Sequence, residues 1–375
     1  MRFTLSSSAL STKLGILSKV INTKNSLSIL DSYLFEIRGG QLIITASDNA
    51  NMMKCYVTLS DYEGEGAVCI PNRIIQAAVK ELPEQPLTFE VSSPDNSIKM
   101  NYQNGSYRVA GQSADDYPNL QPIENDVTEI SIPAGTLASN IQRTMFATAN
   151  DELRMVMNGL YFDLREDSLN IVASDGHKMV RNMIFSCKTA TPSSFILPKK
   201  PAGLLRSVLD LNDETEITVR FNSNNAEIKF TDGILSCRLI EGRYPNYSSV
   251  IPTDNPNVVN IDRKGMMSAL RRVLPFASES TQLVKLRLSP NNLELSSEDI
   301  DFATSAHEDL VCDYNGAQMS IGFKGSALFD ILNNLSSDNV TIELGDPSRA
   351  GVIRPSEQPE NEDILMLIMP MLLSE

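Results

Sequence analysis

The chain has 375 residues, a net charge of −15, 42% hydrophobic residues and 21% charged residues, which is typical of a globular protein of two to four domains. The overall negative charge, taken alone, argues against nucleic acid as a ligand. No apolar run approaches the ~20 residues of a membrane span, and the sequence enters a strand pattern at Arg2 without a signal peptide. Five scattered cysteines indicate reduced thiols, so we expect a cytoplasmic protein with no metal site, cofactor or membrane partner.

The sequence repeats itself at the scale of a whole domain. Three motifs recur at one offset of 127 residues: Tyr117-Pro118-Asn119 as Tyr244-Pro245-Asn246, Ile70-Pro71 as Leu197-Pro198, and Ala46-Ser47-Asp48 as Ala173-Ser174-Asp175. A third, more divergent copy shares Val259-Asn260-Ile261 and Met369-Pro370 with the other two. A period this long is that of a domain rather than of a solenoid unit. We therefore predict three copies of one domain, residues 1–126, 127–253 and 254–375.

Each repeat alternates strands with two helices. In the first repeat a strand over 2–5 precedes a helix over 8–22, where Leu10, Leu14 and Leu17 form an apolar stripe. Strands follow, then a second helix over 72–82, then a strand pair over 97–109 joined at Asn104-Gly105. The fold class is therefore α+β, with two helices packed on antiparallel sheet in each copy.

The charges are distributed unevenly. The six predicted helices, over 8–24, 72–82, 134–149, 199–210, 262–277 and 323–335, hold fourteen basic and four acidic residues. Their balance of +10 leaves −25 for the rest of the chain. Lysine and arginine can simply solvate a helix surface, but the same sign on six helices favours a shared function. A positive surface attracts phosphate groups without reading sequence, so the helices could line a hole around DNA.

At this point several segments, in order and end to end, resemble the bacterial sliding clamp, the β subunit of DNA polymerase III. They are Asn158-Gly159-Leu160, Ala173 to Met179, Gly242 to Tyr247 and Ile368 to Met371. The resemblance implies three clamp domains forming half of a closed ring, made by a head-to-tail homodimer. It implies a non-enzymatic processivity factor that encircles duplex DNA and tethers the replicative DNA polymerase, the clamp loader and other proteins with a clamp-binding motif.

The resemblance also implies a hydrophobic pocket for a partner peptide rich in Gln, Leu and Phe. Carried over to this sequence, its residues are Arg154, Met157, Ser174, Gly176, His177, Lys178, Met179, Pro245, Val250, Leu367, Met369, Pro370, Met371 and Leu372. Val156, Lys324, Ala327 and Leu372 depart from the best-known members, so the preferred peptide should differ in detail. Methionines gather in these segments and suit adaptable surfaces, although they could equally fill gaps in a core.

Two further surfaces are expected. The residues expected near phosphates are Lys24, Arg143, Lys199, Lys200, Arg271 and Arg272. The subunit interface is expected where Leu274, Pro275 and Phe276 of one chain meet the strand Tyr107–Val109 of another, because open sheet edges invite pairing.

Two other functions compete with the clamp. A catalytic set could join Ser174, Asp175 and His177, but the sequence has no nucleophile elbow, phosphate-binding glycine loop or metal cluster. His177 could also be a structural histidine after a turn. A ring-like repeat scaffold without DNA binding is the second alternative, and the basic helix faces count against it.

Overall fold

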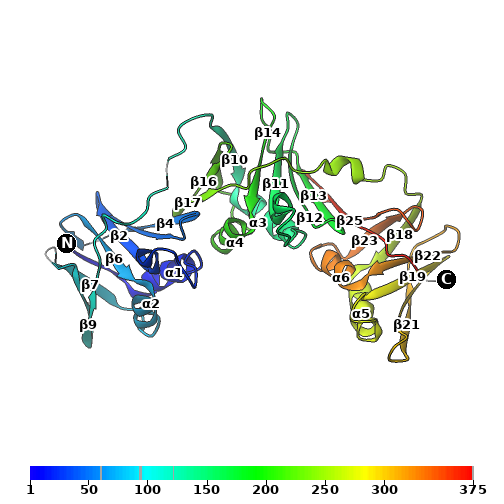
Figure 1. The fold of residues 1–375 in the computed structure, drawn as a ribbon, viewed down its shortest axis with the longest axis horizontal. Coiled ribbons are helices and arrows are strands. Elements are labelled where there is room, and N and C mark those ends of the chain that lie inside the picture. Colours follow the sequence, from blue (N-terminus) through cyan, green and yellow to red (C-terminus); the bar gives the residue numbers. More distant parts are fainter. Residues whose placement is uncertain (60, 93–94, 121, 374–375) are drawn as a thin grey trace. The chain divides into compact units, whose positions relative to one another are not determined.

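The computed structural model describes residues 1–59, 61–92, 95–120 and 122–373 (Figure 1). The strands pair antiparallel throughout the described sheets, and the chain divides into two compact units. Unit 1 comprises Met1–Ala138 and Lys200–Leu239, and unit 2 comprises Ser139–Lys199 and Ile240–Glu375. The middle repeat therefore contributes strands to both units.

Unit 1 contains a five-stranded and an eight-stranded sheet. The first has the order β5 (Asp61–Glu63), β1 (Arg2–Ser6), β7 (Pro86–Val91), β8 (Ser97–Tyr102) and β9 (Gly105–Ala110). The second has the order β10 (Thr128–Pro133), β15 (Glu216–Phe221), β16 (Asn225–Phe230), β17 (Gly233–Arg238), β4 (Asn51–Thr58), β3 (Gln41–Ser47), β2 (Ser32–Arg38) and β6 (Gly66–Pro71). The β17–β4 pairing joins the middle repeat to the first, with Gly233 opposite Cys55 and Cys237 opposite Asn51.

Unit 2 contains an eight-stranded and a four-stranded sheet. The first has the order β14 (Ser193–Pro198), β11 (Gly159–Leu164), β12 (Leu169–Ser174), β13 (Lys178–Ile184), β25 (Glu362–Ile368), β24 (Gly351–Pro355), β23 (Asn339–Leu344) and β18 (Asn257–Asp262). The second has the order β21 (Thr304–Val311), β20 (Asn292–Asp299), β19 (Leu283–Ser289) and β22 (Met319–Lys324). The β13–β25 pairing joins the middle repeat to the third, with Lys178 opposite Ile368 and Ile184 opposite Glu362.

All six predicted helices are present, and each is shorter than its predicted window. They are α1 (Ser7–Leu17), α2 (Asn72–Lys80), α3 (Ala134–Met145), α4 (Lys199–Val208), α5 (Arg263–Val273) and α6 (Gly325–Asn333). Four 3-10 helices accompany them: η1 (Ser28–Asp31), η2 (Met155–Asn158), η3 (Tyr247–Val250) and η4 (Leu274–Phe276). The largest error is at the end of α1, because the β-branched and Asn residues over 20–23 have poor helix propensity.

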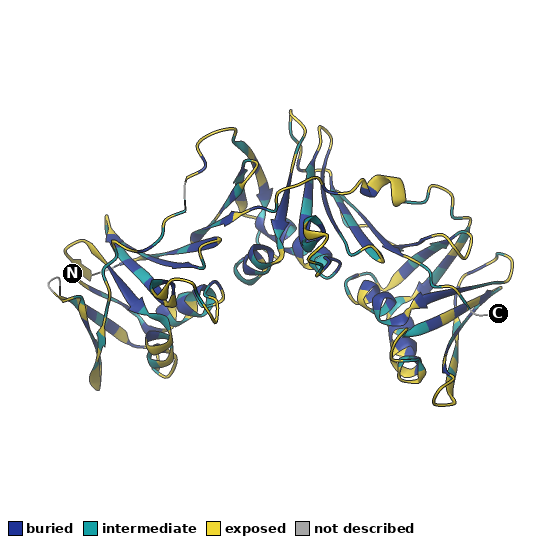
Figure 2. Cartoon of the chain, viewed as in Figure 1, coloured by how far each residue is buried: buried dark blue, intermediate teal, exposed yellow. Residues whose placement is uncertain are grey.

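The apolar faces are buried as the sequence pattern predicts. Leu10, Leu14 and Leu17 of α1 are fully buried, and Phe3 stacks on Phe89 with ring centroids 4.8 Å apart. Figure 2 shows the buried residues gathered on the strands and on the helix sides that face them. The helices therefore turn their other sides, which carry most of the basic residues, to solvent.

Candidate functional site

A small apolar cavity of about 180 Å³ lies within unit 2, where the turn between β12 and β13 approaches η2, η3 and the end of β25. Its lining residues are Met157, Ser174, Gly176, His177, Lys178, Met179, Tyr244, Pro245, Asn246, Tyr247, Val250, Leu367 and Met369. The opening is partly walled by exposed apolar side chains, since Val250 is 55% exposed and Met369 is 44% exposed.

The turn between β12 and β13 is held by the Asp175 carboxylate. This carboxylate accepts hydrogen bonds from the backbone N–H of His177 at 2.8 Å and of Lys178 at 2.9 Å, and from Lys178 Nζ at 2.6 Å. Burial alone would raise the pKa of the Asp175 carboxyl, but these hydrogen bonds outweigh it and lower the pKa below the usual value. Asp175 therefore remains ionised and acts as a structural anchor.

Gly176 is required at the tip of this turn. Its φ is +91°, and a Cβ there would lie 2.9 Å from Arg154 Nη1. The Asp175 carboxylate binds the backbone of His177, so its printed hydrogen bonds are those of a turn rather than of an acid–base pair. The geometry thus favours the structural interpretation of Ser174, Asp175 and His177 over the catalytic one.

One wall of the cavity is aromatic. Tyr244 stacks on Tyr161 with centroids 4.6 Å apart, and Tyr247 meets Tyr161 edge-on at 6.1 Å. The Tyr247 hydroxyl donates to Asp163 at 2.6 Å and accepts from Arg165 at 2.9 Å. Burial, followed by the hydrogen bond to the Asp163 carboxylate, raises the pKa of Tyr247. Both rings are thus fixed, neutral surfaces suited to apolar contact.

The remaining wall comes from the end of β25. Leu367 is opposite Met179 in the β13–β25 pairing. The Met369 N–H donates to the carbonyl oxygen of His177 at 2.8 Å, which extends the pairing by one residue. Beyond it, the Met371 N–H donates to the Gly322 carbonyl oxygen at 2.8 Å. Met369 is thereby held at the mouth of the cavity.

Three comparisons with known proteins bear on this site. Family models of the DNA polymerase III β subunit match residues 1–121 (N-terminal domain), 131–246 (central domain) and 248–372 (C-terminal domain). The chain belongs to the DNA polymerase III β-subunit family, the bacterial sliding clamps. The three clamp domains expected from the resemblance are thereby confirmed.

Individual relatives match over their full length. The proteins named Beta sliding clamp from Salmonella typhimurium and Haemophilus influenzae are 29% and 27% identical, each with 100% of both chains covered. A crystal structure of a DnaN sliding clamp from Pseudomonas aeruginosa bound to griselimycin superposes with a TM-score of 0.94 at 23% identity, again with 100% of both chains covered. At that identity the structural likeness speaks for the fold.

Ten of the residues that the clamp resemblance assigns to the pocket do line the cavity: Met157, Ser174, Gly176, His177, Lys178, Met179, Pro245, Val250, Leu367 and Met369. Arg154 lies beside the cavity, where its Nε binds Asp151 at 2.8 Å. Pro370, Met371 and Leu372 are not among the lining residues, and Leu372 points into solvent with 91% exposure.

The prediction missed three lining residues, Tyr244, Asn246 and Tyr247. The recurring Tyr-Pro-Asn motif was the available signal, since it marks a segment that each domain holds in place. The divergent positions Lys324 and Ala327 do not line the described cavity, whereas Val156 packs in the cluster beneath it.

The residues expected near DNA fall into two groups. Lys24, Lys199, Arg271 and Arg272 are exposed, although Lys24 lies in the loop after α1 rather than in a helix. Arg143 pairs with Glu362 at 2.8 Å with 13% of its side chain exposed, and Arg272 pairs with Glu308. Lys200 Nζ binds Asp48 at 2.5 Å, together with the Val20 carbonyl oxygen and Asn22. The described helices nevertheless carry eleven basic residues and one acidic residue.

The residues expected at the subunit interface lie at sheet edges or beside them. Tyr107 and Val109 belong to β9, which pairs only with β8 within the described sheet. Leu274, Pro275 and Phe276 form η4 after α5, close to β20 and β21, and Phe276 is 40% exposed. A cavity of about 110 Å³, lined by residues that include Ile74, Tyr107 and Val109, lies against β9.

Other kinds of site were sought in the described ranges. Within residues 1–59, 61–92, 95–120 and 122–373, no group of three His, Cys, Asp or Glu side chains could hold a metal ion. The five cysteines are free and buried, and burial raises the pKa of Cys55 to about 11. No helix in the described part of the chain is long and apolar enough to cross a membrane.

Proposed function

We propose that this sliding-clamp family member is a processivity factor of DNA replication, acting in the cytoplasm as a homodimeric ring around duplex DNA. The observation that carries the proposal is the cavity of unit 2, in which segments of the central and C-terminal family domains form one apolar, aromatic-walled site. In this role the chain is a tether without catalytic residues, cofactor or metal. Its partners are the replicative DNA polymerase, the clamp loader and other proteins with a clamp-binding motif.

The site suits a short apolar peptide. About 180 Å³ accommodates one or two large side chains, and the mouth is lined by the apolar groups of Met369, Val250 and Pro245. Burial of a Leu and a Phe stabilises the complex by about 1.5–3 kcal/mol each before ordering costs. A single peptide should therefore bind with micromolar affinity, and two sites per ring would add avidity.

Fluorescence polarisation with a Gln-Leu-x-Leu-Phe peptide tests this site. Met369→Ala removes an apolar group from the mouth and should weaken binding about ten-fold. Leu372→Ala is the matched control, because its side chain is 91% exposed and does not line the cavity. Equal affinity of the two variants, or unchanged binding after deletion of residues 369–375, would place the partner site elsewhere.

The basic helix surfaces are the proposed contact to DNA. Exposed Lys24, Lys199 and Arg271 can neutralise phosphates without reading bases. Because such contacts are weak at physiological salt, retention should come from the closed ring. A clamp placed on circular DNA by a clamp loader should persist and then be lost when the circle is cut. Equal lifetimes on cut and uncut circles would instead favour a ring-like scaffold without DNA binding.

The homodimer is the third part of the proposal. Phe276 of one chain can enter the cavity beside β9 of another, where Ile74, Tyr107 and Val109 offer apolar contacts. Changing Leu274 and Phe276 to Ala removes burial of about 1.5–3 kcal/mol per side chain at each contact. Light scattering should then show monomers at micromolar concentration, where the wild-type chain is dimeric. A wild-type chain that is monomeric at that concentration would contradict the closed ring.

A further inference from the structure

Two strands of the described sheets have an unpaired edge at opposite ends of the sequence. β9 is the last strand of the five-stranded sheet in unit 1, and β21 is the last strand of the four-stranded sheet in unit 2. Both are regular and both alternate exposed with half-buried residues. An edge of this kind is a template for antiparallel pairing with another chain.

The backbone determines which residues of β9 can pair outward. The Gly111 N–H donates to the Asn96 carbonyl oxygen at 3.0 Å, in register with the β8–β9 pairing. Hydrogen-bonded and non-hydrogen-bonded pairs alternate along antiparallel strands. Tyr107 and Val109 therefore bond to β8, and the free N–H and C=O groups of the edge belong to Ser106, Arg108 and Ala110.

The same reasoning applies to β21. The Cys312 N–H donates to the Asn291 carbonyl oxygen at 3.3 Å, in register with the β20–β21 pairing. Leu310 and Glu308 therefore bond to β20, whereas Val311, Asp309 and His307 present their backbone groups outward. If β9 and β21 of two chains pair antiparallel, Arg108 must face one of these three outward residues, because any one-residue shift would bring paired backbone groups together.

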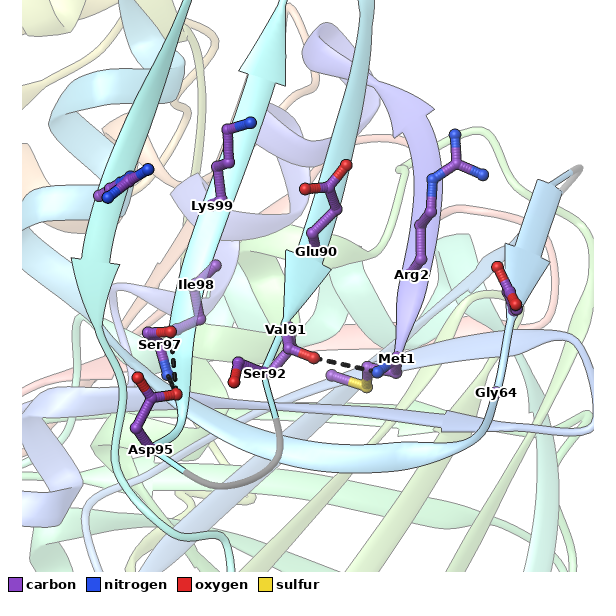
Figure 3. A pocket seen from close by; sticks show the side chains of 12 residues that line it. Met1, Arg2, Gly64, Glu90, Val91, Ser92, Asp95, Ser97, Ile98 and Lys99 are labelled. Atoms are coloured by element: carbon purple, nitrogen blue, oxygen red, sulfur yellow. Dashed lines mark hydrogen bonds between the residues drawn. The ribbon is translucent and has the colours of Figure 1, made fainter.

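The side chains of the first sheet form a charged row that ends at Arg108. Successive cross-strand partners are Glu63, Arg2, Glu90, Lys99 and Arg108. Figure 3 shows Arg2, Glu90 and Lys99 side by side on neighbouring strands. Lys99 and Arg108 make no ion pair among the described residues, so the row reaches the edge with two positive charges.

The second sheet carries the complementary row. Successive partners across it are Arg287, Glu294 and Asp309, so two negative charges meet the edge at β21. The rows that end at the other outward residues lack this charge. His307 is opposite Ser296, which is opposite Lys285, and Val311 is opposite Asn292.

We propose that β9 of one chain pairs with β21 of a second chain in the register that sets Arg108 directly opposite Asp309. This inference rests on the homodimer proposed above and specifies its geometry. In this register Lys99 and Arg108 face Glu294 and Asp309, and Tyr107 meets Leu310 on the other face. Registers shifted by two residues place Arg108 against His307 or Val311, where no carboxylate receives it. The occupant of each edge is thus a second copy of this chain.

Charge reversal tests the register. Arg108→Glu and Asp309→Arg should each weaken dimerisation about ten-fold or more at 50 mM salt, because like charges then meet at both contacts of the ring. The chain that carries both substitutions restores an opposite pair at each contact and should return to within about three-fold of the wild-type dissociation constant. Lys188→Glu, at an exposed lysine outside both rows, is the control for net charge. Sedimentation velocity measures all four variants, and the differences should shrink at 500 mM salt.

The outcomes separate this inference from the function on which it rests. A wild-type chain that is monomeric would contradict the proposed homodimer itself. A dimeric wild-type chain with single variants as tight as the control, or a double variant no tighter than the single ones, would overturn the register alone. Rescue by the double variant also excludes misfolding as the cause of the single defects.

Discussion

The two junctions between repeats share one backbone design and differ in their side chains. In unit 1 the turn at Asp48 precedes β4, which pairs with β17 over five residue pairs. In unit 2 the turn at Asp175 precedes β13, which pairs with β25 over seven residue pairs. The strand end continues alike in both, since the Arg238 N–H donates to Ala50 at 2.9 Å as the Met369 N–H donates to His177 at 2.8 Å.

The side chains at equivalent positions set the two junctions apart. Leu367 and Met369, which line the cavity, correspond to Ser236 and Arg238 in unit 1. The cation on the turn also differs, because Asp175 is bound by Lys178 of its own strand, whereas Asp48 is bound by Lys200 of α4. The same fold thus supports an apolar site in one copy and a polar contact in the other, so the binding site depends on a few side chains rather than on the domain.

The largest expected effect concerns the charged groups of the longer junction. Asp363 binds both Arg181 and Arg354, and Arg181 keeps only 14% of its side chain exposed. Burial lowers the pKa of Arg181, which is the sign of a desolvated cation. Asp363→Asn should lower the free energy of unfolding by about 3 kcal/mol, because an unpaired charge is left behind.

Asp232→Asn is the matched change at the shorter junction. It removes the partner of Lys13, but the Asp232 side chain is 65% exposed. The expected loss is about 1 kcal/mol or less. Urea unfolding of both variants measures the difference, and equal losses would show that the two junctions are stabilised alike.

The next effect makes the unit 2 site resemble its unit 1 counterpart. Met369→Arg places at the mouth of the cavity the residue type that unit 1 has at Arg238. Loss of apolar contact and burial of charge should weaken the clamp-binding peptide by about 2 kcal/mol, or thirty-fold. Leu372→Arg adds the same charge at an exposed position and should leave peptide affinity unchanged at high salt.

A smaller effect is expected from the cation that reaches the unit 1 turn. Lys200→Met removes the hydrogen bonds to Asp48, Asn22 and the Val20 carbonyl oxygen. The free energy of unfolding should fall by about 1–2 kcal/mol. Hydrogen exchange of the amides over 18–27 should rise more than exchange elsewhere. Lys199→Met, at the exposed neighbouring lysine, is the control, and equal exchange in both variants would rule out an anchoring role for Lys200.

The smallest effect is on the pH dependence of stability. Burial raises the pKa of Asp48, but hydrogen bonds from Lys200 and Asn51 outweigh it, so the pKa is lowered, as it is for Asp175. A lowered carboxyl pKa contributes stability above the unfolded pKa of about 4, and this contribution disappears as the pH falls through the folded pKa. Asp48→Asn and Asp175→Asn should each cost on the order of 1 kcal/mol at pH 7 and progressively less below pH 4. A cost that stays constant from pH 7 to pH 3 would contradict this linkage.

The sequence predicts the fold well because its signals are periodic. Apolar stripes such as Leu10 to Leu17 fix the helices, and the offset of 127 residues fixes the repeat. The helix ends are less well predicted, since propensity changes gradually over residues such as Val20 and Ile21. Strand exchange between repeats is invisible to local patterns, because β4 and β17 lie far apart in the sequence.

The candidate site divides along the same line. Residues inside recurring or recognised motifs, such as Ser174 to Met179, were predicted to line a pocket and do line the cavity. Tyr244 and Tyr247 were missed because an aromatic wall depends on packing against Tyr161 from another strand. The basic residues were predicted from charge alone, and the ion pairs of Arg143 and Lys200 arise from tertiary contacts that charge counting does not see.

The pairing of strands from different repeats imposes an order on synthesis. β4 is complete at Thr58, but its partner β17 begins at Gly233, 175 residues later. At about 5–20 residues per second on the ribosome, β4 waits roughly 9–35 s for its neighbour. β13 waits as long for β25, which begins at Glu362. During translation the nascent chain therefore carries two unprotected strands in succession, and holdase chaperones that bind such edges should raise the yield of folded protein.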